Sequence, residues 1–132
     1  MGKPIVYIDH SEIRPGRLEE VTKAIPQLVG FVDEHEPQLI SYGFYIDEQA
    51  SAMTVVAVHP DSASLELHLE IGGPQFRKLA AFIDLRLIEV YGEPSQTVLN
   101  QLRQKADMLG EDGRVVVREM HTGFARLPSA DS

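Results

Sequence analysis

The chain has no cysteine and no tryptophan among its 132 residues. The lack of cysteine excludes disulfide bonds, thiolate metal sites and a cysteine nucleophile, and it fits a protein of the reducing cytoplasm. Long apolar runs are missing too, because the longest extend over about five residues whereas a membrane-spanning helix needs roughly twenty. The amino terminus lacks the long apolar core of a signal peptide. We therefore expect a cytoplasmic protein with no membrane partner.

Positive charge is scarce as well. Twelve Lys and Arg residues stand against twenty Asp and Glu residues, and the net charge is −8. Such a charge repels phosphate backbones, so we expect no nucleic-acid partner. The sequence has no His-Glu-x-x-His or comparable ligand spacing, which predicts no metal site. The Gly72-Gly73-Pro74 stretch lacks the glycine pattern and the lysine of a phosphate-binding loop.

What the chain does contain is a regular alternation of strand and helix patterns. The predicted elements are a strand over 5–13, a helix over 18–36 kinked or restarted at Pro26, strands over 39–46 and 52–58, a helix opening at Asp61 or Ser62 and interrupted at Gly72-Gly73-Pro74, a short helix with Phe76 and Ile83 on one face, and a strand over 85–91. The order β-α-β-β-α-β is that of a ferredoxin-like α+β fold. It predicts a four-stranded antiparallel sheet with both helices on one face.

A C-terminal extension over 94–120 follows this core. Ser95 caps a predicted helix that ends at Gly110, and the run Arg114–Met120 predicts a fifth strand. That strand could join the chain's own sheet or cross to a partner. Residues 1–120 are thus expected to form a single domain, with its core over 4–93, and residues 121–132 to form a flexible tail.

The other face of the sheet has no cover in this arrangement. The first three strands are apolar at nearly every position, which is typical of strands buried on both faces. Since the chain has little left to cover that face, a second copy of the same sheet is the expected cover. The sequence therefore predicts a homodimer, but it does not show which strand faces look inward.

Several short motifs together resemble the antibiotic biosynthesis monooxygenase family, over roughly residues 4–93. They are Pro15-Gly16, Glu36-Pro37 before Leu39-Ile40-Ser41-Tyr42, Ser64-Leu65-Glu66-Leu67-His68-Leu69, and Glu89-Val90-Tyr91. The resemblance implies a dimeric α/β barrel. It also implies oxidation of a small phenol or quinol by O₂, with no metal or flavin cofactor, after a base removes a phenolic proton.

The chain departs from this family in one respect. A Glu-x-Trp pair common in the family corresponds here to Ala57 and His59, while the helix histidine is present as His68. His68 is the main candidate for the proton acceptor, because a histidine can take a proton near neutral pH. His59 is the second catalytic candidate, since it would line the mouth of the barrel if its strand face looks inward.

Five further residues are candidates for substrate binding. Asp9 and His10 are neighbours on the first strand, so only one of them can enter a given cavity. Tyr42, Phe44 and Phe76 could form aromatic walls around a flat ligand, or could pack as an ordinary core. Three functions therefore stay open: a cofactor-independent oxygenase, a protein that binds or senses a small apolar or aromatic molecule without turnover, and a structural dimer with a filled barrel.

Overall fold

The computed structural model describes residues 3–126. Its elements run in the order β1 (Ile5–Ile13), α1 (Leu18–His35), β2 (Ser41–Asp47), β3 (Ala52–His59), α2 (Ser62–Phe76), the short 3-10 helix η1 (Arg77–Leu79), β4 (Ile83–Tyr91), α3 (Gln96–Leu109) and β5 (Arg114–Arg118). The ferredoxin-like α+β fold expected from the sequence is confirmed.

The strands form one mixed sheet in the order β2-β3-β1-β4-β5. Strand β1 pairs antiparallel with β3 and β4, and β3 pairs antiparallel with β2. Strand β5 pairs parallel with β4, because α3 carries the chain back to the same end of the sheet. Of the two positions left open for the fifth strand, the structure shows the one in the chain's own sheet.

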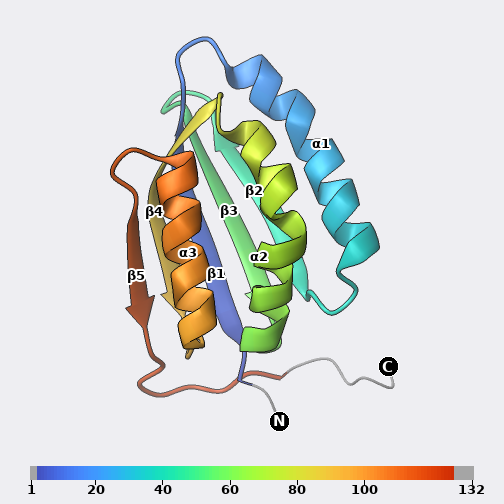
Figure 1. Ribbon diagram of the computed structural model, residues 1–132, viewed down its shortest axis with the longest axis vertical. Helices are drawn as coiled ribbons and strands as arrows, with labels where there is room; N and C mark the ends of the chain where they lie inside the picture. The colour runs from blue at the N-terminus through green and yellow to red at the C-terminus, as the bar shows by residue number, and fades with distance from the viewer. Residues whose placement is uncertain (1–2, 127–132) are drawn as a thin grey trace.

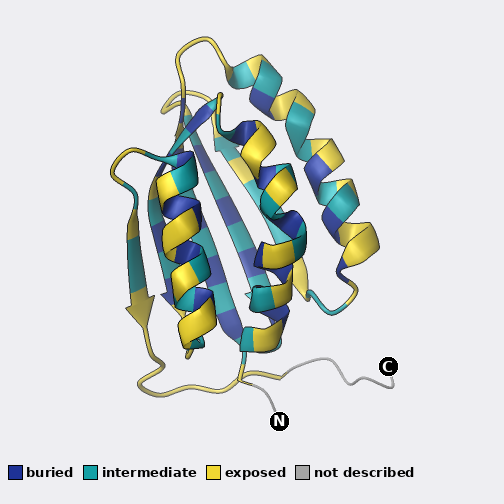
Figure 2. Ribbon diagram, in the orientation of Figure 1, coloured by how far each residue is buried: buried dark blue, intermediate teal, exposed yellow. Residues whose placement is uncertain are grey.

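All three helices cover one face of the sheet and leave the other face uncovered (Figure 1). We call these the covered face and the open face. The strands alternate accordingly: Ile5, Tyr7 and Asp9 of β1 are buried under the helices, whereas Val6 and Ile8 are partly exposed. Figure 2 shows this alternation of buried and intermediate positions across the sheet.

Two helix breaks expected from the sequence do not occur. Helix α1 continues through Pro26, and α2 continues through Gly72-Gly73-Pro74 to Phe76. A proline removes the bond to the carbonyl four residues earlier. Here those carbonyls belong to Thr22 and Glu70, which are exposed, so water can replace the lost bonds. The short helix expected around 76–83 shrinks to η1, and Ile83 begins β4.

The C-terminal end of the described chain lies beyond the last strand. Residues 121–126 are exposed and form neither helix nor strand, while residues 127–132 of the predicted tail lie outside the described residues. No helix between residues 3 and 126 combines the length and the apolar character needed to cross a membrane.

Candidate functional site

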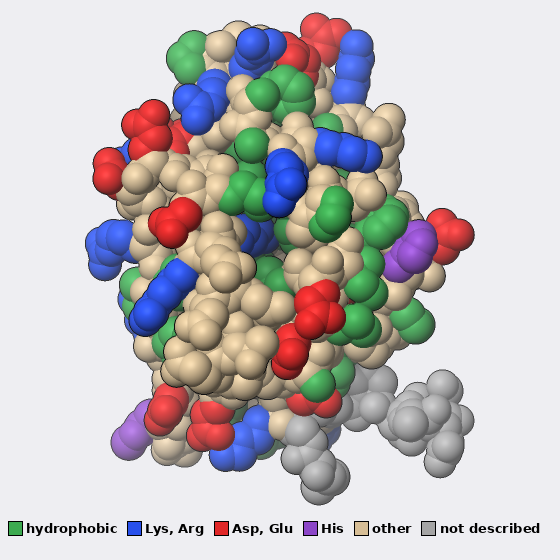
Figure 3. Space-filling model, viewed as in Figure 1, with side chains coloured by type: hydrophobic (Ala, Val, Ile, Leu, Met, Phe, Trp, Pro, Cys, Tyr) green, Lys and Arg blue, Asp and Glu red, His purple; other side chains and the backbone are tan. Residues whose placement is uncertain are grey.

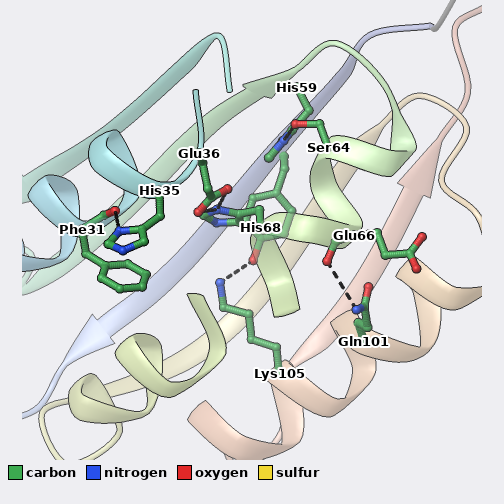
Figure 4. A network of polar contacts seen from close by, with 10 residues as sticks. Phe31, His35, Glu36, His59, Ser64, Glu66, His68, Gln101 and Lys105 are labelled. Atoms are coloured by element: carbon green, nitrogen blue, oxygen red, sulfur yellow. Dashed lines mark hydrogen bonds and ion pairs between the residues drawn. The ribbon is translucent and has the colours of Figure 1, made fainter. Parts of the chain in front are cut away.

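A histidine and a glutamate meet in the interior beneath the helices. His68 lies in the middle of α2, whose N-terminus is capped by Asp61, and Glu36 is the residue at which α1 ends. The Nδ1 atom of His68 lies 2.8 Å from Oε1 and 2.9 Å from Oε2 of Glu36. The two side chains point toward each other in Figure 4, and both are fully buried. The middle of α2 and the C-terminal end of α1 thus hold a buried His–Glu pair.

This contact fixes the chemistry of the imidazole. An ionised carboxylate can only accept hydrogen bonds, so it favours the tautomer in which Nδ1 of His68 carries the proton. The other ring nitrogen, Nε2, then presents a lone pair. That nitrogen is buried and has no hydrogen-bond partner in the described part of the chain. His68 is therefore oriented to accept a proton from something that lies beside it.

His59 lies next to this pair but differs from it. It is the last residue of β3, its Nδ1 lies 2.7 Å from the hydroxyl of Ser64, and its ring centre is 5.3 Å from that of His68. Burial, together with the neighbouring charges of His68 and Lys105, lowers the pKa of His59 to about 3. His59 is thus held in its neutral form, which suits a hydrogen-bonding role beside His68 better than a second proton acceptor.

A second charged group enters the interior from the C-terminal extension. Lys105 of α3 donates hydrogen bonds to the Tyr7 hydroxyl at 2.7 Å and to Oδ2 of Asp9 at 2.8 Å. Its ammonium also lies 4.0 Å from the ring centre of Phe76. Burial, reinforced by the charge of Asp9, raises the pKa of Tyr7 well above its usual value. The tyrosine therefore stays protonated between two ionic groups.

The buried groups surround a small cavity beneath the helices. Its volume is about 20 Å³. A cavity of roughly 10 to 15 Å³ on this measure can hold one water molecule. Four of its lining residues carry a buried polar atom without a hydrogen-bond partner: Oδ1 of Asp9, Oγ of Ser11, the Tyr42 hydroxyl and Nε2 of His68. Because a buried polar atom without a partner is costly, this cluster points to a ligand or an ordered water.

The predicted aromatic walls come together at this cavity. Tyr42, Phe44 and Phe76 all line it, and the ring centres of Tyr42 and Phe76 lie 5.3 and 5.1 Å from that of His68. Burial raises the pKa of Tyr42 well above its usual value, so its hydroxyl remains available as a donor. The lining is otherwise mostly apolar, so the chemistry of the walls, though not the volume of the closed cavity, suits a largely apolar ligand.

The structure also separates the two neighbours on β1. Asp9 lines the cavity, whereas His10 lies on the open face, where its Nε2 contacts Oε1 of Glu89 at 2.6 Å. Of the seven residues singled out in the sequence, the structure thus brings six to one region and places His10 on the other side of the sheet.

Two residues of this region escaped the sequence reasoning. Glu36 ends the charged run Asp33-Glu34-His35-Glu36, which looks like a solvated surface, yet it is only 2% exposed. Lys105 belongs to no recognised motif. It lies three residues after Leu102 and four before Leu109, so it stands on the apolar stripe of α3. That spacing was a usable signal, because a charge on the buried stripe of a helix needs a buried partner.

Within residues 3–126, no three His, Cys, Asp or Glu side chains are placed so that they could hold a metal ion.

Comparison with known proteins bears on the fold. No protein-family model matches the sequence, and no curated protein matches it. Among solved structures, MupZ from Pseudomonas fluorescens superposes with a TM-score of 0.72 at 18% identity, over 95% of this chain and 96% of MupZ. A putative antibiotic biosynthesis monooxygenase from Caulobacter crescentus CB15 gives 0.61 at 15% identity, over 67% of this chain and 88% of its own.

A third structure links this fold to a named activity in another protein. SnoaB from Streptomyces nogalater, a cofactor-independent oxygenase, gives a TM-score of 0.58 at 10% identity, over 72% of this chain and 97% of its own. The chain therefore has the fold of the antibiotic biosynthesis monooxygenases, as the sequence motifs indicated. The match to MupZ spans nearly the whole chain, whereas the other two leave more than a quarter of it unmatched.

Proposed function

We propose that this chain, built on the antibiotic biosynthesis monooxygenase fold, is a cofactor-independent oxygenase that acts on a small phenol or quinol with O₂. One observation carries the proposal: His68 is oriented by Glu36 through Nδ1 and keeps Nε2 without a partner beside an interior cavity. The oxygenase named among the structures of this fold supports the reaction class.

The proposed reaction begins with a proton transfer. Nε2 of His68 takes the proton of a phenolic hydroxyl, and Glu36 stabilises the imidazolium that forms. The phenolate is electron-rich enough to reduce O₂, and a bond forms between oxygen and an unsubstituted ring carbon. Loss of water from the resulting hydroperoxide leaves a carbonyl. One oxygen atom ends in the quinone and the other in water, and the phenol supplies all four electrons.

Three other features of the site suit this chemistry. The Tyr42 hydroxyl lines the cavity and can orient the substrate, while the neutral His59 places an uncharged imidazole beside His68. The Lys105 ammonium also lines the cavity and places positive charge near the developing anion. The apolar lining keeps bulk water away from the reactive intermediates. The reaction uses O₂ as its oxidant and needs no bound cofactor.

We also propose that the protein works as a homodimer in the cytoplasm, joined through the open faces of two sheets. An apolar stripe supports this arrangement: Val6 pairs with Val58 and Ile8 with Val56 in neighbouring strands, and all four residues stay partly exposed. A second copy would remove the stripe from water. Sedimentation velocity on wild type and on Val56→Glu tests this point, with a dimer expected for the first and a monomer for the second. A monomeric wild type would contradict it.

The decisive test of the reaction is O₂ consumption with a panel of naphthols and dihydroxynaphthalenes. His68→Ala should lower turnover by about a hundredfold or more, since general-base catalysis contributes roughly 10²- to 10⁴-fold. His10→Ala is the matched control, because His10 also bonds a glutamate but lies on the open face. Equal losses in both variants, or full activity in His68→Ala, would contradict the proposed base.

The second candidate function is ligand binding without turnover. The departure from the family pattern favours it, because Ala57 and His59 stand where the family commonly has its Glu-x-Trp pair. Tight binding of a naphthol without O₂ consumption, unchanged in His68→Ala, would support this function over the first.

A further inference from the structure

The interior cavity is too small for the substrate proposed for it, so a ligand must displace part of its wall. A much larger hollow lies just outside, in a groove between α2 and α3, with about 450 Å³ of space. Figure 3 shows this hollow on the helix side of the molecule, with Lys or Arg surface recessed in it. Among all their lining residues, the cavity and the groove share only Phe76 and Lys105.

We propose that this groove is the entrance and the outer subsite of the buried site, and that Phe76 and Lys105 form the movable partition between them. The ligand would be a phenol that carries a hydrogen-bonding substituent. Its aromatic end passes the partition toward His68, and its substituent stays in the groove. The inference rests on the proposed site, but it holds for binding as well as for turnover.

The partition consists of two side chains in contact. The Lys105 ammonium lies 4.0 Å from the ring centre of Phe76, and Phe76 and Lys105 are 4% and 7% exposed. Phe76 is the last residue of α2, two positions after Pro74, where the helix gives way to η1. A side chain at a helix end has more freedom than one in the middle of a helix, so the Phe76 ring is the part of this wall that can swing outward.

Polar atoms in the groove define the outer part of the ligand. Oε1 of Gln101 is buried and has no hydrogen-bond partner, while Nε2 of the same side chain bonds weakly to the carbonyl of Glu66 at 3.5 Å. An unpartnered acceptor calls for a donor, such as an amide N–H or a hydroxyl on the substituent. Lining residues Glu70, Arg77 and Gln104 add further hydrogen-bonding groups.

A rival entrance exists between α1 and α2. A hollow of about 30 Å³ lies there, and it shares Leu28 and Leu79 with the interior cavity. That hollow is far smaller than the groove, and its wall lacks an unpartnered polar atom among those described. Leu79 is 4% exposed, the same value as Phe76, so the two residues make a matched pair for deciding between the routes.

Access to the interior can be measured without any turnover. Diethyl pyrocarbonate modifies unprotonated imidazole, and mass spectrometry reports its rate at each histidine. Phe76→Ala should raise the rate at His68 about tenfold or more, whereas Leu79→Ala should change it less than about twofold. His59 is the internal reference, because it is as buried as His68 but does not line the cavity. If Phe76→Ala does not fold, Phe76→Leu replaces it with a smaller expected increase.

Three results would overturn the entrance: no change at His68 in Phe76→Ala, an equal or larger change in Leu79→Ala, or rates at His59 and His68 that rise together, which indicates local unfolding. Because no catalysis is measured, an inactive protein with a labelled His68 would reject the proposed reaction and keep the entrance.

The outer subsite has its own test by calorimetry with 2-naphthol and a hydroxynaphthamide. Gln101→Ala should weaken binding of the amide about fivefold or more and leave the naphthol unchanged, because only the amide offers a donor to Oε1. Asn100→Ala, an amide removed from the exposed side of the same helix, should change neither affinity. Equal affinities of Gln101→Ala and wild type for the amide would overturn the outer subsite.

Discussion

Between residues 3 and 126, two His–Glu pairs lie on opposite faces of one sheet, and they are similar in contact distance but differ in burial and in partners. The contact between His68 and Glu36 measures 2.8 Å, and that between His10 and Glu89 measures 2.6 Å. The first pair is fully buried beneath the helices. In the second, the side chains of His10 and Glu89 are 41% and 16% exposed.

The partners of each pair show what the difference means. Glu89 also accepts hydrogen bonds from the Tyr91 hydroxyl at 2.7 Å and from Arg118 at 3.0 Å, and the bonds from Tyr91 and His10 lower its pKa. It is the centre of a surface network. His68, in contrast, keeps one ring nitrogen unpartnered beside a cavity. A short His–Glu contact alone therefore does not distinguish the two pairs; burial and the unpartnered Nε2 of His68 beside a cavity do.

The largest expected effect concerns Lys105, the buried cation beneath the helices. Lys105→Met leaves Asp9, which is 4% exposed, without its counter-charge, and we expect a loss of about 3 to 5 kcal/mol in the free energy of unfolding. Chemical denaturation measures it. Adding Asp9→Asn to this variant should recover most of the loss, since the double variant buries no unpaired charge. A single variant as stable as wild type would show that water reaches this side of the sheet.

The next effect is the contribution of His59 to the pH dependence of the free energy of unfolding. Unfolded His59 takes a proton near pH 6.5, whereas the folded protein holds the pKa of His59 at about 3. The unfolded state then binds more protons between these values, so the stability that neutral His59 contributes is complete above pH 6.5 and is lost as the pH falls. The loss is at most about 1.4 kcal/mol per pH unit.

Substitution separates this contribution from those of the carboxylates. Thermal unfolding between pH 7 and 4 should show a flatter dependence for His59→Gln than for wild type. Parallel curves for wild type and His59→Gln would contradict the assignment of a buried neutral imidazole.

Most of the fold could be predicted from the sequence, for identifiable reasons. Short runs of β-branched and aromatic residues and the apolar stripes of the helices are local patterns, and they placed β1, β3 and β4 within two residues of their bounds. Proline and glycine misled at Pro26 and at Gly72-Gly73-Pro74, because their effect on a helix depends on whether the affected carbonyl is exposed. That is a tertiary property, which local sequence does not contain.

The site was only half predictable for a related reason. His68 stood out through the family motif and its place beside the apolar stripe of its helix. His59 stood out as the residue that closes a strand, and Asp9 as the neighbour of His10 on the first strand. Glu36 did not, since a glutamate in a charged run is usually solvated and its burial depends on how the end of α1 meets α2. Contacts such as the one between Glu36 and His68 join residues 32 positions apart, and no spacing rule reaches that far.

A smaller change tests the proposed division of labour between the two glutamates. Glu36→Gln keeps an oxygen for Nδ1 of His68 but removes the charge, so we expect about 1 to 2 kcal/mol of lost stability and at least about a tenfold loss of turnover. Glu89→Gln should leave turnover unchanged and should shift only the concentration dependence of the dimer. Steady-state O₂ consumption and sedimentation separate the two results. Loss of turnover in Glu89→Gln would show that the faces are functionally linked.

The smallest effect tests how closely the covered face is packed around the partition. In α2, a Cβ at Gly72 would lie 2.8 Å from the Phe76 ring, whereas a Cβ at Gly73 would meet nothing within 4 Å. Alanine favours a helix over glycine by up to about 1 kcal/mol, so Gly73→Ala should stabilise the protein by up to that amount. Gly72→Ala has the same helix gain but must displace the ring, so its unfolding midpoint should fall below that of Gly73→Ala. Equal midpoints in thermal melts would mean that the Phe76 ring already moves freely, and that the covered face is no more tightly closed than the open one.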